Sequence, residues 1–330
     1  MTIPLSEEEL VAEFDRRWNR GIIFYEDNPK IQTQTVNGFQ YEFTVTGAIG
    51  KKPFIKDNAD EPPARTSLVK KSPGYVPGSD IDVSGYEITY INDTHLLMFN
   101  KFCMYRPHLL LLTKDGYRRQ YEQLDLQDFQ ASWNVLGSLN WKYFMFFNCG
   151  KDGGCSRLHK HMQISPYLKD RLIPWPETSS KPPNTPYEFV LRRFESGLAP
   201  HEALVIYEQM MAEVRSLLGL NGTRSDHVPH NVALGQGWIL VIPRRNAGVG
   251  GAYGNTLSML GMVSVATKEE LRCWLSQGPR EVQSQLGILK GVGSGAKAQS
   301  SNGHHILSHS RGCSISTQDG FESQRQEAVN

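Results

Sequence analysis

The stretch that decides the fold of this 330-residue chain is Asn148-Cys149-Gly150-Lys151-Asp152-Gly153-Gly154-Cys155-Ser156-Arg157-Leu158-His159-Lys160-His161-Met162-Gln163. Its second part predicts a β-strand over 158–164, in which successive side chains point to opposite faces. The polar side chains then share one face and the apolar side chains share the other. The polar set is His159, His161 and Gln163, and the apolar set is Leu158, Met162 and Ile164.

A glycine-rich loop precedes this strand. Glycines permit positive φ and close approach of the backbone, so consecutive N–H groups of residues 150–156 can converge on an anion. Asn148 and Ser156 flank the turn with hydrogen-bonding side chains, and Lys151 adds a positive charge. Alone, such a loop indicates only a turn between strands. Followed directly by two histidines, it predicts a site for a phosphate group.

The chemistry that fits this arrangement is attack on phosphorus by an imidazole nitrogen. A neutral His161 can form a covalent nucleotidyl intermediate, which divides one difficult transfer into two easier ones. We expect His159 to position the loop or the ring by hydrogen bonding, and Gln163 to hold a phosphate oxygen without adding charge. The proton for the leaving group can come from His159, from the nucleotide or from water.

Two other interpretations of the histidine pair remain open at this point. An H-x-H pair on a strand is common in zinc sites, and Cys155, His108, His227 or His230 could supply a third ligand. No second pair with metal-ligand spacing accompanies it, so we rank zinc below the nucleophile and assign no metal ligand. The pair could also be buried and structural. We expect His227 and His230 to lie in a solvated turn.

The composition restricts the class of protein. Hydrophobic residues make up 39% of the chain and charged residues 21%, which is typical of a globular protein with a substantial core. The formal net charge of +1 argues against a broad surface for nucleic acid or anionic membrane. The five cysteines lack C-x-x-C spacing and the first residues lack a signal-peptide pattern. We therefore expect reduced thiols and a location in the cytosol or nucleus.

Further helices and strands are expected on both sides of the decisive stretch. Capping signals at Ser6, Asp125 and Thr267 predict helices to about Arg20, over 126–140 and to about Gln277. Apolar spacing predicts another helix over 201–219. Strands are expected at 39–46, 95–105, 108–113, 143–147, 231–234, 238–242 and 259–265. A long loop is expected between Pro53 and Asp80.

Changes in composition divide the chain into two halves and a tail. Five prolines between residues 168 and 187 indicate a long connection. We expect an N-terminal half at 1–187, which carries the H-x-H-x-Q motif, and a C-terminal half at 188–289. After Pro279 the sequence turns to Gly, Ser, Gln and His, and we expect residues 290–330 to be disordered.

His159-Lys160-His161-Met162-Gln163 resembles the H-x-H-x-Q signature of the galactose-1-phosphate uridylyltransferase branch of the histidine-triad (HIT) superfamily. Within that branch the chain is similar to the fungal diadenosine tetraphosphate phosphorylases, also called ATP adenylyltransferases. The segments that carry this resemblance are 52–53, 99–113, 148–163, 231–244 and 255–262. The resemblance implies an α+β, HIT-like fold of two histidine-triad-like halves, each with an antiparallel sheet.

The resemblance also implies roles for individual residues. His161 matches the nucleophile that becomes adenylylated, and Phe99 and Asn100 match the adenosine side. The complete set of matched substrate-binding positions is Lys52, Phe99, Asn100, Asn148, Gly154, Cys155, Ser156, Arg157, Gln163, Asn255, Thr256, Leu257 and Met262. One departure is Ala266, which stands where a substrate-binding lysine is common, with Lys268 close by.

The implied reaction is phosphorolysis of diadenosine tetraphosphate by inorganic phosphate, which gives ATP and ADP. These small molecules are the expected partners, and a divalent cation such as Mg²⁺ can assist on the substrate's phosphates. A hydrolase is an alternative, although Gln163 in place of a third histidine argues against it. A nucleotide-binding protein with impaired catalysis is another, and a zinc-binding module is the last. The segment after Pro279 shows no resemblance, and we expect it to replace the last part of the family's domain.

Overall fold

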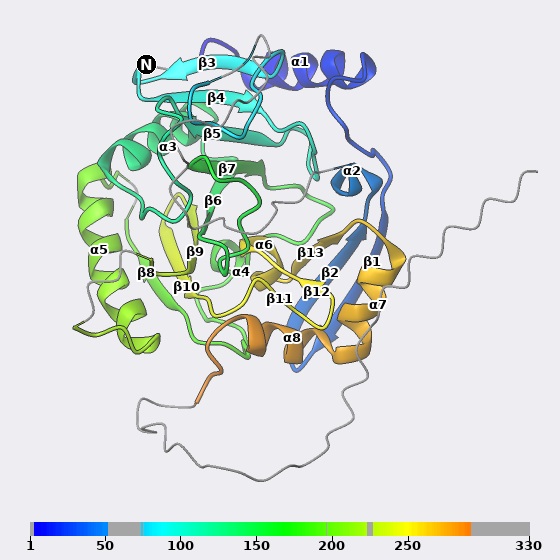
Figure 1. Ribbon diagram of the computed structural model, residues 1–330, viewed down its shortest axis with the longest axis vertical. Helices are drawn as coiled ribbons and strands as arrows, with labels where there is room; N and C mark the ends of the chain where they lie inside the picture. The colour runs from blue at the N-terminus through cyan, green and yellow to red at the C-terminus, as the bar shows by residue number, and fades with distance from the viewer. Residues whose placement is uncertain (1–2, 52–73, 75, 196, 223–226, 292–330) are drawn as a thin grey trace, which may run out of the picture.

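The centre of the fold is an eight-stranded antiparallel sheet (Figure 1). The structure is a computed structural model that describes residues 3–51, 74, 76–195, 197–222 and 227–291. In spatial order the strands are β3 (Glu87–Ile91), β4 (His95–Phe99), β5 (Leu109–Thr113), β7 (His161–Pro166), β6 (Tyr143–Cys149), β9 (His230–Gly235), β10 (Trp238–Pro243) and β8 (Val190–Arg193). Six of them are buried along their whole length, as expected for the middle of a sheet covered on both faces.

Strands from both expected halves join this one sheet. β6 of the first half pairs with β9 of the second half from Met145–Leu234 to Cys149–His230. The predicted α+β fold with antiparallel sheets is confirmed, and the two halves meet edge to edge within it. Of the tail expected to be disordered, residues 292–330 lie outside the described residues.

Helices cover one face of the sheet. They are α1 (Glu7–Asn19), α3 (Leu126–Ser138) and α5 (Pro200–Leu217), of which α3 and α5 lie against each other. Their apolar side chains, such as Phe14 and Phe129, pack in one core with strand residues that include Met162 and Ile164 of β7. This is the apolar face that the sequence predicts for the strand of the histidines.

A second layer covers the other face. It contains the sheet β1 (Lys30–Val36), β2 (Phe39–Val45) and β13 (Met262–Val265), in which β13 runs parallel to β2. The remaining elements are α2 (Gly47–Gly50), α4 (Trp175–Thr178), the hairpin of β11 (Gly248–Val249) and β12 (Ala252–Tyr253), α6 (Thr256–Met259), α7 (Lys268–Gln277) and α8 (Pro279–Leu286). Residues near both ends of the chain, such as Phe43 and Trp274, therefore share a core with Phe144 and Phe146 of β6.

The helix signals in the sequence mostly predict the observed helices. Ser6 and Glu9 form the predicted capping box of α1, and Asp125 caps α3. Thr267 caps α7, but Glu270 accepts the N–H of Ala266 instead of completing a box with Thr267. The sequence did not predict α8, which begins at Pro279, where the missing N–H costs no helical hydrogen bond.

Three strand predictions need correction. The strand predicted at 95–105 ends at Phe99. The strands predicted at 158–164 and 259–265 begin only at His161 and at Met262. His159 forms an isolated bridge with Arg119 ahead of β7. Most of the predicted loop from Pro53 to Asp80 lies outside the described residues. Among the helices that the structure describes, none is long and apolar enough to cross a membrane.

Candidate functional site

The candidate site lies where the end of β6 stands beside the start of β7. Phe146 pairs with Gln163, so two residues further along each strand Asn148 stands opposite His161 on the same face. This face is the one turned away from α3 and α5. His161 and Gln163 therefore share one face, as predicted, and Met162 lies on the helix-covered face.

The His161 ring is held in one orientation by the main chain. Its Nδ1 lies 2.8 Å from the carbonyl oxygen of His159, and the side chain is 5% exposed. A carbonyl can only accept, so Nδ1 carries the proton in this hydrogen bond and Nε2 carries the lone pair. The ring is thus in the tautomer that an imidazole nucleophile requires at Nε2.

The His159 ring does not face the same space as the His161 ring. Its Nδ1 is 2.8 Å from Oγ of Ser79, and its Nε2 is 2.9 Å from Oγ1 of Thr113 and 3.1 Å from the carbonyl oxygen of Asp115. Burial lowers the pKa of His159 to about 4, so the ring is neutral near pH 7. We therefore assign to His159 the positioning role that the sequence predicted, and not the donation of a proton to the leaving group.

A segment that the sequence did not single out fixes the start of the motif. The Asp80 carboxylate accepts the N–H of Leu158 at 2.9 Å and the N–H of His159 at 3.0 Å. Together with Ser79, it fastens the end of the glycine loop. Both residues come from a stretch without periodicity, so no local pattern could have singled them out.

A chain of hydrogen bonds orients the Gln163 amide. The Asn100 side chain accepts the N–H of Phe102 at 3.0 Å, which leaves its amide nitrogen to donate to Nδ1 of His108 at 3.3 Å. Nε2 of His108 then donates to Oε1 of Gln163 at 3.0 Å. Because its oxygen is used in this way, Gln163 presents its NH₂ group as the donor. This is the orientation that can hold a phosphate oxygen.

The glycine loop is fastened to the second half of the chain through Asn148. Its side-chain oxygen accepts from Nδ2 of Asn231 at 3.2 Å, from the N–H of Thr256 at 2.9 Å and from the hydroxyl of Thr256 at 2.6 Å. Asn255 caps α6 at this point, with its side-chain oxygen accepting from the N–H groups of Leu257 and Ser258. Asn148 thus joins the two halves directly beside His161.

A buried guanidinium supports the same loop from behind. Arg244 is fully buried and donates to the carbonyls of Gly153, Gly254, Asn246 and Leu286. Burial lowers its pKa to about 9, which still leaves it charged near pH 7. A positive charge therefore lies directly under the loop that is predicted to bind phosphate.

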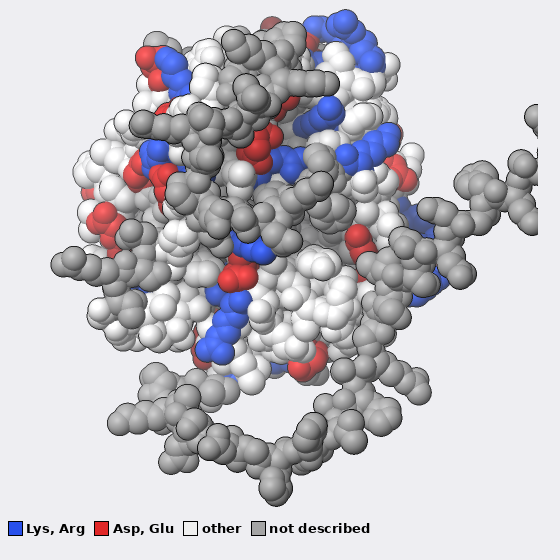
Figure 2. Space-filling model, in the orientation of Figure 1, with Lys and Arg blue, Asp and Glu red and all other residues white. Residues whose placement is uncertain are grey.

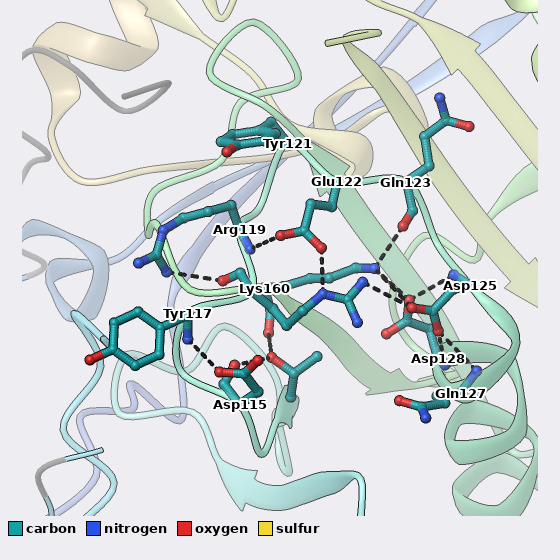
Figure 3. A network of polar contacts seen from close by, with 12 residues as sticks. Asp115, Tyr117, Arg119, Tyr121, Glu122, Gln123, Asp125, Gln127, Asp128 and Lys160 are labelled. Atoms are coloured by element: carbon teal, nitrogen blue, oxygen red, sulfur yellow. Dashed lines mark hydrogen bonds and ion pairs between the residues drawn. The ribbon is translucent and has the colours of Figure 1, made fainter. Parts of the chain in front are cut away.

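Lys160, between the two histidines, points to the opposite side of the sheet. Figure 3 follows its ammonium to the Asp128 carboxylate and the Gln123 carbonyl, each 2.6 Å away. Asp128 also lies 3.0 Å from Nε2 of His95. Burial favours a raised pKa for Asp128, but hydrogen bonds and charges from His95 and Lys160 hold this pKa at about 2. Lys160 thereby anchors the strand of His161 to the start of α3.

The other predicted site residues lie in different parts of the structure. Phe99 pairs with Leu109, which pairs with Ile164, so its side chain lies on the helix-covered face and packs against Phe14. The match of Phe99 to the adenosine side stays a prediction. Leu257 and Met262 are buried in the second core. Cys155, Ser156 and Arg157 are half-buried in the loop beside Gly154, and Lys52 lies outside the described residues.

The ligands needed for a zinc site do not come together. In the part of the chain that the structure describes, no three His, Cys, Asp or Glu side chains are grouped to hold a metal ion.

The expectation that His230 lies in a solvated turn is wrong. It is fully buried in β9, donates from Nδ1 to the carbonyl of Val228 and accepts from the hydroxyl of Tyr207. His227 is exposed and stacks on Tyr121.

The surface charge agrees with local rather than extended anion binding. Figure 2 shows Lys and Arg side chains interspersed with Asp and Glu side chains, without a continuous basic surface among the described residues of this face. The formal net charge of +1 points the same way.

Comparison with known proteins gives two adjoining family matches. Residues 64–179 match the Ap4A phosphorylase N-terminal domain, and residues 183–289 match the ATP adenylyltransferase C-terminal domain. Together they cover about two thirds of the chain. The second match extends through α8, so the expectation that the segment after Pro279 replaces the end of the domain is wrong for residues up to 289.

One curated relative and several solved structures are similar to the chain. Diadenosine 5',5'''-P1,P4-tetraphosphate phosphorylase 2 of Saccharomyces cerevisiae is 26% identical over an alignment of 279 residues, and the alignment covers 75% of this chain and 82% of that protein. The crystal structure of yeast Ap4A phosphorylase Apa2 has a TM-score of 0.67 at 19% identity, and covers 86% of this chain and 97% of its own. The same enzyme in complex with Ap4A has a TM-score of 0.64 at 20% identity, covering 86% and 99%. These structures are similar to this chain in fold.

Proposed function

The chain belongs to the family of Ap4A phosphorylases and ATP adenylyltransferases, and from that premise we propose how it cleaves its substrate. The reaction is phosphorolysis of diadenosine tetraphosphate by inorganic phosphate, with ATP and ADP as products. The enzyme is therefore a nucleotidyltransferase. The roles of its residues follow from the geometry around His161.

In the first step, the lone pair on Nε2 of His161 attacks the α-phosphorus of one adenylyl group. A P–N bond forms, the bond from that phosphorus to its bridging oxygen breaks, and ATP leaves. As the ring becomes positively charged, the carbonyl of His159 stabilises it through the hydrogen bond from Nδ1. The Gln163 NH₂ group holds the phosphate oxygens, on which negative charge increases, together with N–H groups of the glycine loop other than those of Gly150, Gly154 and Cys155, which bond to protein carbonyls.

In the second step, an oxygen of inorganic phosphate attacks the adenylyl phosphorus. The P–N bond breaks, ADP leaves, and His161 returns to its neutral state with Nδ1 still bonded to His159. A divalent cation such as Mg²⁺ enters this scheme as part of the substrate, held by the phosphates. The described residues offer no group of metal ligands to hold it otherwise.

The observation that carries the proposal is the fixed tautomer of His161 beside Asn148 and the glycine loop. The buried His230 has the same bond from Nδ1 to a carbonyl, but its Nε2 accepts from the Tyr207 hydroxyl, whereas the His161 ring lies beside Asn148 and the glycine loop. The Asn100–His108–Gln163 chain supports the same conclusion, because it turns an amide donor toward the same face.

The test is formation of ATP and ADP from diadenosine tetraphosphate, with and without inorganic phosphate. We expect ATP and ADP in equal amounts with phosphate, and an adenylyl adduct on His161 by mass spectrometry after rapid quenching without phosphate. The His161→Ala variant, checked for folding by circular dichroism, should give neither. Formation of AMP independent of phosphate would instead indicate the hydrolase alternative, and tight binding without turnover would indicate an impaired enzyme.

A further inference from the structure

Gln120, in the segment between β5 and α3, contacts the main chain of both strands of the site. It is 3% exposed. Its Nε2 donates to the carbonyl of His161 at 3.0 Å and to the carbonyl of Asn148 at 3.1 Å, and its Oε1 accepts the N–H of His161 at 2.8 Å. One side-chain amide thus bonds both main-chain groups of the residue that carries the nucleophile.

The amide stands where the ladder between β6 and β7 stops. The two strands are paired from Tyr143–Pro166 to Phe146–Gln163. Two positions further, the same register would join Asn148 to His161, and there the Gln120 amide lies between the two backbones. A side-chain amide carries the same donor and acceptor groups as a peptide unit, so it replaces the absent strand partner. The strands separate at this point, and the chain after β6 turns into the glycine loop.

The main chain of Gln120 holds the remaining segments of the site. Its N–H donates to the carbonyl of Leu158 at 2.8 Å, and its carbonyl accepts the N–H of Gly150 at 3.0 Å. One residue is therefore bonded to the chain before the histidines, to His161, to the end of β6 and to the first glycine of the loop. Loss of the side chain would release His161 and Asn148 from this residue, while the main-chain bonds to Leu158 and Gly150 remain.

We propose that Gln120 is a positioning residue for the transfer, which fixes the His161 backbone relative to Asn148 and the glycine loop. The proposal rests on the proposed function, because it concerns the distance between Nε2 of His161 and the phosphorus that it attacks. Gln120 itself acts through the backbone and not on the substrate. A displacement of 1 Å from a mutation away from the reacting atoms can cost about 10²-fold in rate. The effect is therefore expected in kcat rather than in KM.

The first experiment compares Gln120→Met with a matched control, Gln283→Met. Gln283 is also buried, donates to the carbonyls of Ser258 and Met259, and accepts from the Tyr41 hydroxyl. Both variants lose three hydrogen bonds at a similar side-chain volume. We expect Gln120→Met to lower kcat by about 10- to 100-fold with KM within about threefold. The control should lose stability to a comparable degree and keep kcat within about twofold.

The second experiment uses Gln120→Glu, which keeps the acceptor for the N–H of His161. When ionised, this carboxylate faces the carbonyls of His161 and Asn148 and cannot donate to them; protonation restores one donor. The kcat of the variant relative to wild type should therefore rise as the pH is lowered from about 8 to about 6.

Three results would overturn the proposal. They are an unchanged kcat in Gln120→Met, a fall in its kcat no larger than the fall in Gln283→Met, and a kcat of Gln120→Glu relative to wild type that does not change with pH. Wild type and His161→Ala are assayed alongside. If wild type forms no ATP and ADP, the proposed function fails. If only the Gln120 comparisons fail, the proposed function stands.

Discussion

The main-chain carbonyl of His159 lies 2.8 Å from Nδ1 of His161 and fixes the protonation of that ring. The two histidines of the motif therefore contribute in different ways. His161 supplies a ring nitrogen, and His159 supplies a backbone oxygen, while its own ring is bound to Ser79 and Thr113 on another side. Spacing in the H-x-H motif is thus explained by hydrogen bonding within the chain rather than by two rings facing one ligand.

This relationship predicts unequal effects of substitution. His161→Asn removes the nucleophile and should lower kcat by at least about 10³-fold. His159→Asn keeps the backbone carbonyl and loses only ring contacts, so kcat should fall by about 10-fold. Steady-state kinetics of both variants, with ¹⁵N NMR of the wild-type rings, will test this. Equal loss in the two variants, or a proton on Nε2 of His161, would contradict it.

Two buried histidines predict how stability depends on pH. Burial lowers the pKa of His159 and of His230 to about 4, below the value of about 6.5 in an unfolded chain. Between these values the unfolded state binds more protons, so the free energy of unfolding should fall as the pH drops from about 6.5 to about 4. Each histidine contributes a slope of up to about 1.4 kcal/mol per pH unit. Asp128, with a pKa of about 2, loses its contribution only below this range.

Urea denaturation at several pH values measures this slope, and His230→Gln provides the control. The amide cannot titrate, so the number of protons taken up on unfolding should fall by about one, and the slope of the free energy of unfolding against pH should decrease accordingly. The Tyr207 hydroxyl and the Val228 carbonyl retain a polar partner in this variant. An unchanged slope would mean that His230 does not titrate on unfolding as proposed.

The buried pair of Lys160 and Asp128 predicts a coupled effect on stability. Lys160→Met leaves a buried carboxylate and should cost about 3 kcal/mol, and Asp128→Asn should cost a similar amount by leaving a buried ammonium. The double variant should lose less than the sum by at least about 1 kcal/mol, because neither charge is then left alone. Additive losses would rule out this coupling. As a surface control, Glu269→Gln breaks the exposed pair with Arg272 and should change stability little.

Local patterns in the sequence predicted the parts of the site that local chemistry determines. Alternation on the strand placed His161 and Gln163 on one face because side chains in a strand repeat every two residues. Capping residues located the starts of α1, α3 and α7 because each satisfies helical N–H groups within three residues. These interactions involve neighbours in the chain, so they leave a readable signature.

Contacts between distant residues left no such signature. Asp80 and Gln120 hold the motif through bonds that span 78 and 41 residues, and neither lies in a periodic segment. His230 was misplaced because polar neighbours and Pro229 precede it, whereas β9 begins at His230 itself. The face on which the Phe99 side chain lies depends on pairing with Leu109, which the sequence does not reveal. Tertiary register decides each of these positions.

A close backbone approach predicts that Gly154 tolerates no side chain. Its φ is +80°, and a Cβ atom there would lie 2.5 Å from the carbonyl oxygen of Gly254. That same carbonyl accepts from Arg244 at 2.8 Å, so moving it would disturb the cation under the loop. Gly154→Ala should therefore raise KM and lower kcat, and should destabilise the fold by about 1–3 kcal/mol.

The matched control is Gly137→Ala in α3, where a Cβ atom would meet nothing within 4 Å. Alanine is favoured over glycine inside a helix, so this variant should gain up to about 1 kcal/mol and keep full activity. Thermal denaturation and steady-state kinetics of both variants provide the comparison. If Gly154→Ala matched wild type in KM and stability, the loop would not be held against residue 254 as the structure shows, and its role in placing phosphate next to His161 would have to be abandoned.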